Sequence, residues 1–181
     1  MTLKALPIAA LVALALAGCA GAPAGTSATP TPTPSAEAVA STADFGAVDV
    51  CGLMTTNAEI AAWTDDLFAE LAEAQLAAEE GRLEGVGMDE LYAWADRAYA
   101  DIGAFGEYMD DVAATVPDGD VAADVLTVKD GFTLSIRTIA DIAASADNVD
   151  DYTAAIDEID PNAFNVNDAA DAIVAYETAN C

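Results

Sequence analysis

The feature that most constrains the fold is an apolar pattern of heptad type between residues 89 and 115. Apolar side chains recur there at alternating steps of four and three residues, at Leu91, Ala95, Ala98, Ile102, Phe105, Met109 and Val112. Residues 120–146 repeat the pattern at Val121, Val125, Val128, Phe132, Ser135, Ile139 and Ile142. This spacing places one apolar row along one face of a helix, as in helices that pack side by side. The sequence therefore predicts two long helices, separated by the break at residues 116–119.

A third long helix is predicted over residues 55–80. Its apolar row consists of Ile60, Trp63, Leu67, Leu71, Ala74 and Ala78. Thr56 and Glu59 have capping-box spacing, in which each side chain satisfies a backbone amide that the first turn leaves open. Gly81 is expected to end the helix.

The last part of the chain has a divided pattern. Asn148 is placed to cap a short helix that Pro161 ends, because the residue before a proline is pushed out of the helical region. Asn165 or Asn167 then caps a final helix that runs to Cys181.

These segments predict an all-α fold. Short turns between long helices favour an up-and-down bundle of three long helices plus a fourth that is broken at Pro161. The short stretch Val48-Asp49-Val50 resembles a strand, but we interpret it as coil.

The N-terminal segment has the pattern of a bacterial export signal. Lys4 supplies the positive charge, and residues 5–15 form an apolar stretch too short to span a bilayer core of about 30 Å. The segment closes on Leu16-Ala17-Gly18-Cys19. It resembles the lipobox of bacterial lipoproteins, and this resemblance implies that Cys19 carries a diacylglyceryl group and is the first mature residue. The alternative is an ordinary secretory peptide, since residues 13–15 and 15–17 both fit an A-x-A cleavage pattern.

The resemblance implies a body held at the extracytoplasmic face of the cell membrane by lipid on Cys19. Residues 20–42 are rich in Ala, Thr, Ser, Gly and Pro and predict an extended tether. We therefore divide the chain into a signal peptide (1–18), an anchor and tether (19–50) and an acidic helical domain (51–181). The tether could also carry O-linked sugars.

Two cysteines remain once Cys19 is assigned to lipid. Cys51 precedes the first predicted helix and Cys181 is the last residue of the sequence. Four antiparallel elements return the chain to its starting end, so an oxidising compartment predicts a Cys51–Cys181 disulfide. Two free thiols or an intermolecular bridge are the alternatives.

The charge balance limits the partners. The 181 residues include 32 acidic and five basic side chains, for a net charge of −27. Nucleic acid and anionic headgroups are excluded as partners, because phosphate recognition needs clustered Lys and Arg. The acids are spread along every segment, which favours a solvated, self-repelling surface over a site for cations or a basic partner.

Catalytic motifs are missing from the sequence. The chain has no histidine, which excludes Ser-His-Asp and Cys-His machinery and histidine-containing zinc sites. Adjacent acids such as Asp65-Asp66 and Asp110-Asp111 could in principle serve glycoside hydrolysis, which needs two carboxyls across a sugar cleft. With 32 acids such pairs arise by chance, so we expect no catalytic residues and no cofactor.

Two acidic stretches carry the oxygen ligands that calcium takes. One is Asp118-Gly119-Asp120 with Asp124, and the other includes Asp160, Asn162, Asp168 and Asp171. The second departs from a calcium-binding loop because Phe164 and Asn165 stand where that motif needs a ligand and a glycine. Turn and cap hydrogen bonds explain these residues equally well, and we favour that interpretation.

Several aromatic residues lie beside the apolar row of residues 89–115. They are Tyr92, Trp94, Tyr99 and Tyr108, with Gly103 and Gly106 nearby. Such residues can form a binding patch for a partner. Packing against a neighbouring helix is the more common role.

The sequence thus predicts a non-enzymatic, membrane-tethered lipoprotein whose helical body is a binding or accessory module for a protein or envelope partner. A weak divalent-cation-binding protein is the alternative, and an enzyme that uses paired carboxylates is the third candidate.

Overall fold

The computed structural model of the protein describes residues 41, 43–81 and 87–181. The predicted signal peptide, Cys19, and residues 20–40 and 42 of the predicted tether lie outside these residues. The described part is helical and contains no strand. Its elements, in chain order, are α2 (Ala58–Gly81), α3 (Asp89–Thr115), α4 (Gly119–Ser145), α5 (Val149–Asp157), the 3-10 turn η1 (Pro161–Phe164) and α6 (Asn167–Asn180).

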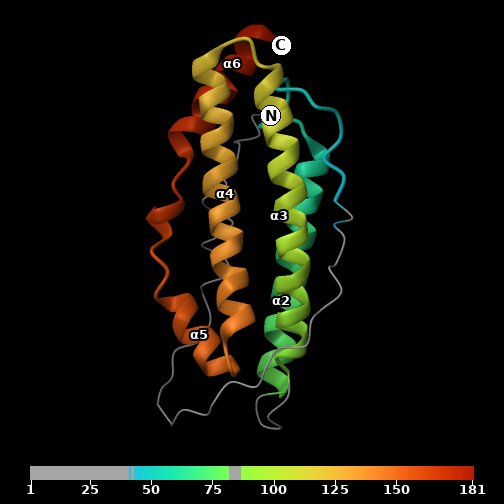
Figure 1. Ribbon diagram of the computed structural model, residues 1–181, viewed down its shortest axis with the longest axis vertical. Helices are drawn as coiled ribbons and strands as arrows, with labels where there is room; N and C mark the ends of the chain where they lie inside the picture. Colours follow the sequence, from blue (N-terminus) through green and yellow to red (C-terminus); the bar gives the residue numbers. More distant parts are fainter. Residues whose placement is uncertain (1–40, 42, 82–86) are drawn as a thin grey trace, which may run out of the picture.

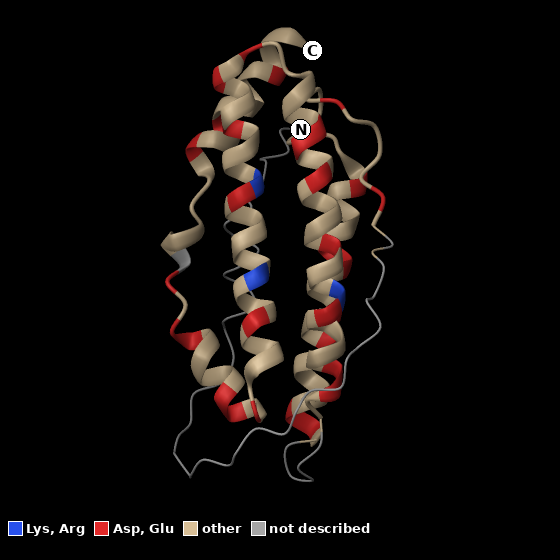
Figure 2. Ribbon diagram, viewed as in Figure 1, with Lys and Arg blue, Asp and Glu red and all other residues tan. Residues whose placement is uncertain are grey.

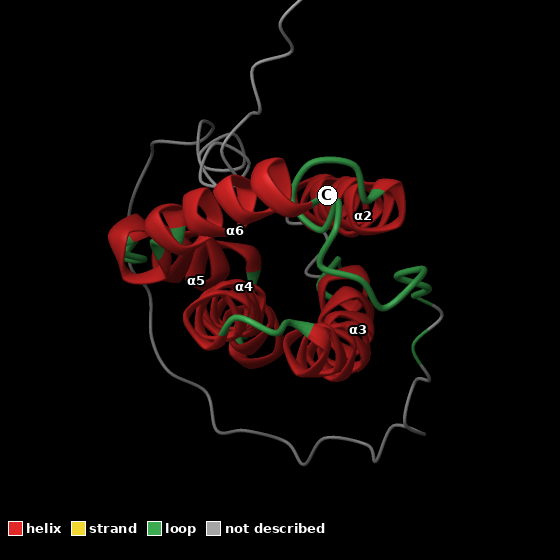
Figure 3. Cartoon of the chain, turned by 90° about the horizontal axis from the view of Figure 1, so that it is seen from above, coloured by secondary structure: helices red, strands yellow, loops and turns green. Residues whose placement is uncertain are grey.

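Three long helices and one broken element form the bundle, as predicted. Helices α2, α3 and α4 run side by side, and α5, η1 and α6 follow along the flank of α4 (Figure 1). The view from above shows α3 between α2 and α4, with α6 crossing one end of the body toward α2 (Figure 3). Helix α3 packs most extensively against α4, α2 chiefly against α3, and α6 chiefly against α4.

The apolar rows explain this arrangement. All seven predicted row residues of α3 are buried, from Leu91 to Val112. In α2 the row is buried from Trp63 to Ala78, and only Ile60 is half-exposed. In α4, Phe132 and Ile142 are half-buried instead of buried, whereas Ile136 and Ala140 beside the row are buried. Burial of these faces supplies most of the driving force for folding.

Helix α2 begins later than predicted and has a different cap. The backbone amide of Thr56 donates to the carbonyl of Gly52 at 2.9 Å, so Thr56 belongs to the preceding turn. Asn57 caps the helix, because its Oδ1 accepts from the amide of Ile60 at 2.8 Å. The predicted capping box of Thr56 and Glu59 was therefore wrong.

The broken fourth element follows the prediction with shifted boundaries. Asn148 caps α5, where its side chain accepts from the amides of Asp150 and Asp151. Helix α5 ends at Asp157, and Pro161 begins η1 as its first residue, a position where the missing amide is no loss. Asn165 accepts from the amide of Asn167 at 3.0 Å, two residues before α6 begins. The N-cap of α6 is Val166, which makes no side-chain cap hydrogen bond, so neither Asn165 nor Asn167 is the predicted cap.

Gly131 allows the fourth element to cross α4 closely. A Cβ placed on Gly131 would lie 2.2 Å from Cγ1 of Val166 and 3.6 Å from the carbonyl oxygen of Phe164. The segment between η1 and α6 therefore lies on α4 where α4 has no side chain. Gly103 and Gly106 of α3 differ, because nothing lies within 4 Å of a Cβ placed on either.

The folded body extends N-terminal to the predicted boundary at residue 51. Phe45 and Val50 are buried in the core, with 5% and 6% of their surface exposed. Phe45 packs edge-on against Trp63, with ring centroids 5.0 Å apart, and also contacts Phe105 and Tyr108. We call residues 43–50 the N-terminal strap, and its aromatic anchor assigns this part of the predicted tether to the body.

Within the described residues, no helix combines the length and the apolar character needed to span a bilayer.

Candidate functional site

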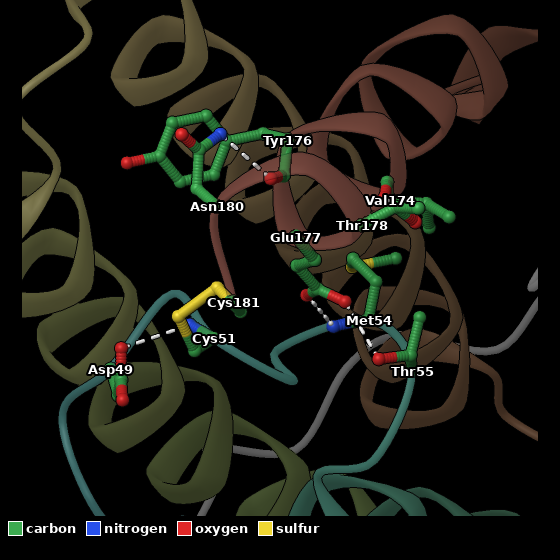
Figure 4. Close-up of a disulfide and its surroundings, with 10 residues drawn as sticks. All are labelled: Asp49, Cys51, Met54, Thr55, Val174, Tyr176, Glu177, Thr178, Asn180 and Cys181. Atoms are coloured by element: carbon green, nitrogen blue, oxygen red, sulfur yellow. Dashed lines mark hydrogen bonds between the residues drawn. A yellow bond between two sulfur atoms is a disulfide. The ribbon is translucent and has the colours of Figure 1, made fainter.

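A disulfide joins the turn that enters α2 to the residue that follows α6. Cys51 and Cys181 are bonded, with their Cα atoms 5.7 Å apart and 130 residues apart in sequence (Figure 4). The predicted pairing is confirmed, and so is the topological reason for it. Both cysteines are exposed, and Asp49 accepts from the backbone amide of Cys51 at 2.9 Å.

A buried carboxylate on α6 makes a second connection beside the disulfide. Glu177 is 5% exposed. Its Oε1 accepts from the amide of Met54 at 2.8 Å, and its Oε2 accepts from the hydroxyl of Thr55 at 2.7 Å (Figure 4). The turn that enters α2 is thus held to α6 by both a covalent bond and charge-assisted hydrogen bonds.

A second buried carboxylate holds α2, α3 and Ser41 together. Asp101 of α3 is fully buried. Its Oδ1 accepts from the hydroxyl of Ser41 at 2.7 Å, and its Oδ2 accepts from the indole nitrogen of Trp63 at 3.1 Å. Arg97, one turn away, approaches Asp101 at 3.4 Å and pairs with Glu70 of α2. Both carboxylate oxygens of Asp101 are therefore engaged within the body.

Neither buried carboxylate was predicted from the sequence, although the residues around each one indicate its burial. Asp101 is the only charged residue in the row formed by Trp94, Ala98, Phe105 and Tyr108. Glu177 follows the buried Ile173 by one helical turn. A single charge inside an apolar row indicates a buried, partnered side chain, because a buried charge without partners costs several kcal/mol.

The four aromatic candidates of α3 are engaged inside the body. Trp94 is buried, and its indole nitrogen donates to the carbonyl of Leu67 at 2.9 Å. Tyr108 is buried, donates to the carbonyl of Ala47 at 3.0 Å and accepts from Asn57. Tyr92 and Tyr99 are half-buried, and they donate to the carbonyl of Ala146 and to Asp141 of α4. Packing accounts for all four residues.

These environments raise the pKa of several tyrosines. Burial, together with the hydrogen bond to Asp141, raises the pKa of Tyr99 to about 12. Burial also raises the pKa of Tyr92, Tyr108 and Tyr152 above its ordinary value. All four phenols therefore stay neutral at physiological pH. Tyr92, Tyr99 and Tyr108 donate hydrogen bonds, whereas the hydroxyl of Tyr152 accepts one from Gln75.

Of the candidate calcium ligands, Asp118, Asp160 and Asn162 take part in turns and caps, whereas Asp168 and Asp171 are exposed on α6. Asp160 accepts from the amide of Asn162 at 2.9 Å and from its side chain at 3.0 Å. Asp118 caps α4 by accepting from the amides of Asp120 and Val121. Across residues 41, 43–81 and 87–181, no three acidic or cysteine side chains gather in a group that could hold a metal ion.

The charges are spread over the whole described surface, as the sequence predicts. Acidic residues occur on every described helix, and the basic residues of the described part lie on α3 and α4 (Figure 2). Lys129 of α4 pairs with Asp110 of α3 at 2.7 Å, and Arg97 connects α3 to α2. Arg97 and Lys129 thus help to hold α3 between its neighbours.

A pocket opens between α2, α3 and α4 near the disulfide end of the body. Its volume is about 180 Å³, and its buried floor consists of Leu53, Thr64, Phe105, Met109 and Val128. Its rim is more exposed and consists of Met54, Ile60, Ala61, Asp65 and Phe132. Among these lining residues Asp65 alone is charged, so the pocket is an apolar concavity with one carboxylate at its edge. This site was not predicted from the sequence.

A scan against protein-family models and searches of curated proteins and of solved structures found no match to this chain.

Proposed function

We propose that the protein is a membrane-tethered lipoprotein whose helical body acts as a non-enzymatic binding or accessory module on the extracytoplasmic side of the membrane. The observation that carries the proposal is the sequence Leu16-Ala17-Gly18-Cys19 at the end of a short apolar segment. The Pro- and Thr-rich tether behind it separates an acidic body from the anchor.

Two features of the body support a non-enzymatic role in binding. Both oxygens of Asp101 and of Glu177 are occupied by internal hydrogen bonds, as expected of structural residues. Two leucines, Leu76 of α2 and Leu134 of α4, have 61% and 50% of their surface exposed. Exposed apolar side chains on a folded, strongly acidic body are candidate contacts for a partner with complementary charge.

The anchor is tested by mass spectrometry of the mature N-terminus. We expect a diacylglyceryl group on Cys19, and we expect Cys19→Ser to lose both the lipid and the membrane association. The double variant Cys51→Ser/Cys181→Ser is the matched control, because it removes two thiols and should keep the lipid. An unmodified thiol at position 19 in the mature chain would overturn the anchor.

The binding role is tested by site-specific photo-crosslinking in intact envelopes. A crosslinker at position 76 or 134 is expected to capture one discrete species, which a crosslinker at the exposed Glu107 of α3 does not capture. Equal capture at all three positions would contradict a defined contact surface. Hydrolytic turnover that is lost on substitution of a single Asp or Glu would replace the proposal with an enzymatic function.

A further inference from the structure

The pocket between α2, α3 and α4 has the size and lining of a small-ligand site. Its five floor residues are buried, and four of them are apolar. A dry cavity of about 150 Å³ lined by Leu, Ile and Phe holds a benzene molecule. The present pocket, at about 180 Å³, therefore fits one aromatic ring with a short substituent.

The polar groups at the pocket determine which charged or hydrogen-bonding groups a ligand can have. The hydroxyl of Thr64 donates to the carbonyl of Ile60 at 2.8 Å, so its proton is not free for a ligand. Asp65 lies at the exposed rim, and within the described part of the chain its carboxylate has neither an ion pair nor a hydrogen bond. The site thus offers a ligand one negative charge at the mouth and no hydrogen-bond donor from Thr64.

The two aromatic residues that line the pocket, one on its floor and one at its rim, also favour a positively charged ligand. The rings of Phe105 and Phe132 lie 5.3 Å apart between centroids, tilted by 53°, and both line the pocket. The faces of aromatic rings carry negative potential and attract cations. The whole chain has a net charge of −27, which repels anions before they reach the rim.

We propose that this pocket binds a small organic cation, whose apolar group of about one ring enters the pocket while its ammonium group faces Asp65. Fatty acids, phosphates and other anions are rejected by Asp65 and by the field of the body. The proposal is independent of the lipid anchor, because every residue that carries it belongs to the folded body.

The test compares three ligands that share one ring and differ in charge: 2-phenylethylammonium, 2-phenylethanol and 3-phenylpropanoate. The protein is the mature chain with Cys19→Ser, which keeps the tether and the body. Methyl signals of Met54 and Met109, which line the pocket, report binding, and Met88 outside the pocket is the internal control. We expect saturable shifts at Met54 and Met109, with a Kd for the ammonium ligand of about 1 mM, as is usual for a ligand of this size.

Two pairs of neighbouring variants separate the site from its surroundings. Asp65→Asn should raise the Kd of 2-phenylethylammonium about fivefold and leave the Kd of 2-phenylethanol unchanged. Asp66→Asn should change neither Kd. Ala61→Phe narrows the mouth from an exposed position and should abolish binding of both ligands. Ala62→Phe adds the same side chain outside the pocket and should leave binding intact.

Each contrary outcome overturns the proposal. If 3-phenylpropanoate bound as tightly as 2-phenylethylammonium, the pocket would have no charge selectivity. Full binding in the Ala61→Phe variant would place the ligand elsewhere. Shifts that affect Met88 as strongly as Met109, or no saturation with any of the three ligands, would show that no such site exists.

Discussion

Asp101 is the residue on which the polar contacts of the body converge. It joins Ser41, Trp63 and Arg97, which come from the N-terminal region, α2 and α3. A carboxylate in such a position stabilises the fold only while its partners remain, because removal of one member leaves the others buried without a partner.

We expect Asp101→Ala to lower the free energy of unfolding by about 3 kcal/mol, since it leaves the indole N–H of Trp63 and the charge of Arg97 without their acceptor. Urea unfolding followed by Trp fluorescence measures the change. Asp111→Ala, at an exposed position of the same helix, is the control and should leave stability unchanged. Equal stability of the two variants would refute the structural role of Asp101.

Tyr99 should make stability depend on pH in the alkaline range. Its pKa is raised from 10.0, the ordinary value of a tyrosine in an unfolded chain, to about 12 in the folded state, mainly because burial and Asp141 disfavour the phenolate. Between these two values the unfolded chain binds fewer protons than the folded one, so the contribution is full below pH 10 and is lost as pH rises toward 12.

The Tyr99→Phe variant removes this contribution. We expect a smaller loss of stability for the variant than for the parent protein between pH 10 and 12, measured by urea unfolding at a series of pH values. The tyrosinate absorbance of the folded protein should also lose its highest-pH component. Identical pH profiles for the two proteins would contradict the contact with Asp141.

At the scale of the elements, apolar periodicity was the reliable guide. The predicted limits of α3, residues 89–115, agree with the structure, and α4 differs by one residue at each end. Periodicity succeeds because these helices bury one continuous face, so the pattern in sequence directly reflects the packing.

Local signals were less reliable where several residues compete for one role. Thr56 and Asn57 both suit a cap, and the turn carbonyl of Gly52 decided between them by accepting from the amide of Thr56. The strap and the pocket depend on contacts between distant segments, such as Phe45 with Phe105. No periodicity within one segment encodes such contacts.

Glycines in two helices should respond oppositely to alanine. Gly131→Ala forces a Cβ against Val166, so we expect it to lower stability despite the better helix propensity of alanine. Gly103→Ala meets nothing within 4 Å and should raise stability by about 1 kcal/mol. Chemical unfolding of both variants measures the contrast.

Adding Val166→Ala to Gly131→Ala should recover part of the loss, because it removes the atom that the new Cβ meets. A stabilising effect of Gly131→Ala alone would contradict the close crossing of the fourth element over α4.

For the whole molecule, the disulfide is the largest single constraint on the unfolded chain. It closes a loop with a sequence separation of 130 residues, for which chain entropy gives a stabilisation of about 5 kcal/mol. We expect Cys51→Ser/Cys181→Ser to unfold at a much lower urea concentration than the parent protein. Reduction of the parent protein should reproduce that shift and leave the double variant unaffected.

The net charge should make the body sensitive to salt. Raising sodium chloride from about 0.1 M to 1 M shortens the Debye length from about 10 Å to 3 Å and screens repulsion among the acids. We expect the melting temperature to rise, as calorimetry would measure. A fall would show that the ion pairs of Arg97 and Lys129 outweigh that repulsion.

The position of the disulfide has a mechanical consequence. Residues 51–181 form one covalent loop, so a pull on the chain N-terminal to Ser41 reaches the sulfur–sulfur bond after residues 41–50 have peeled away. Ten extended residues lengthen the chain by about 35 Å at most. Beyond that extension the disulfide divides the force between the first residues of α2 and the last residues of α6. The two ends of the bundle are then pulled together, and neither helix is unwound from one free end.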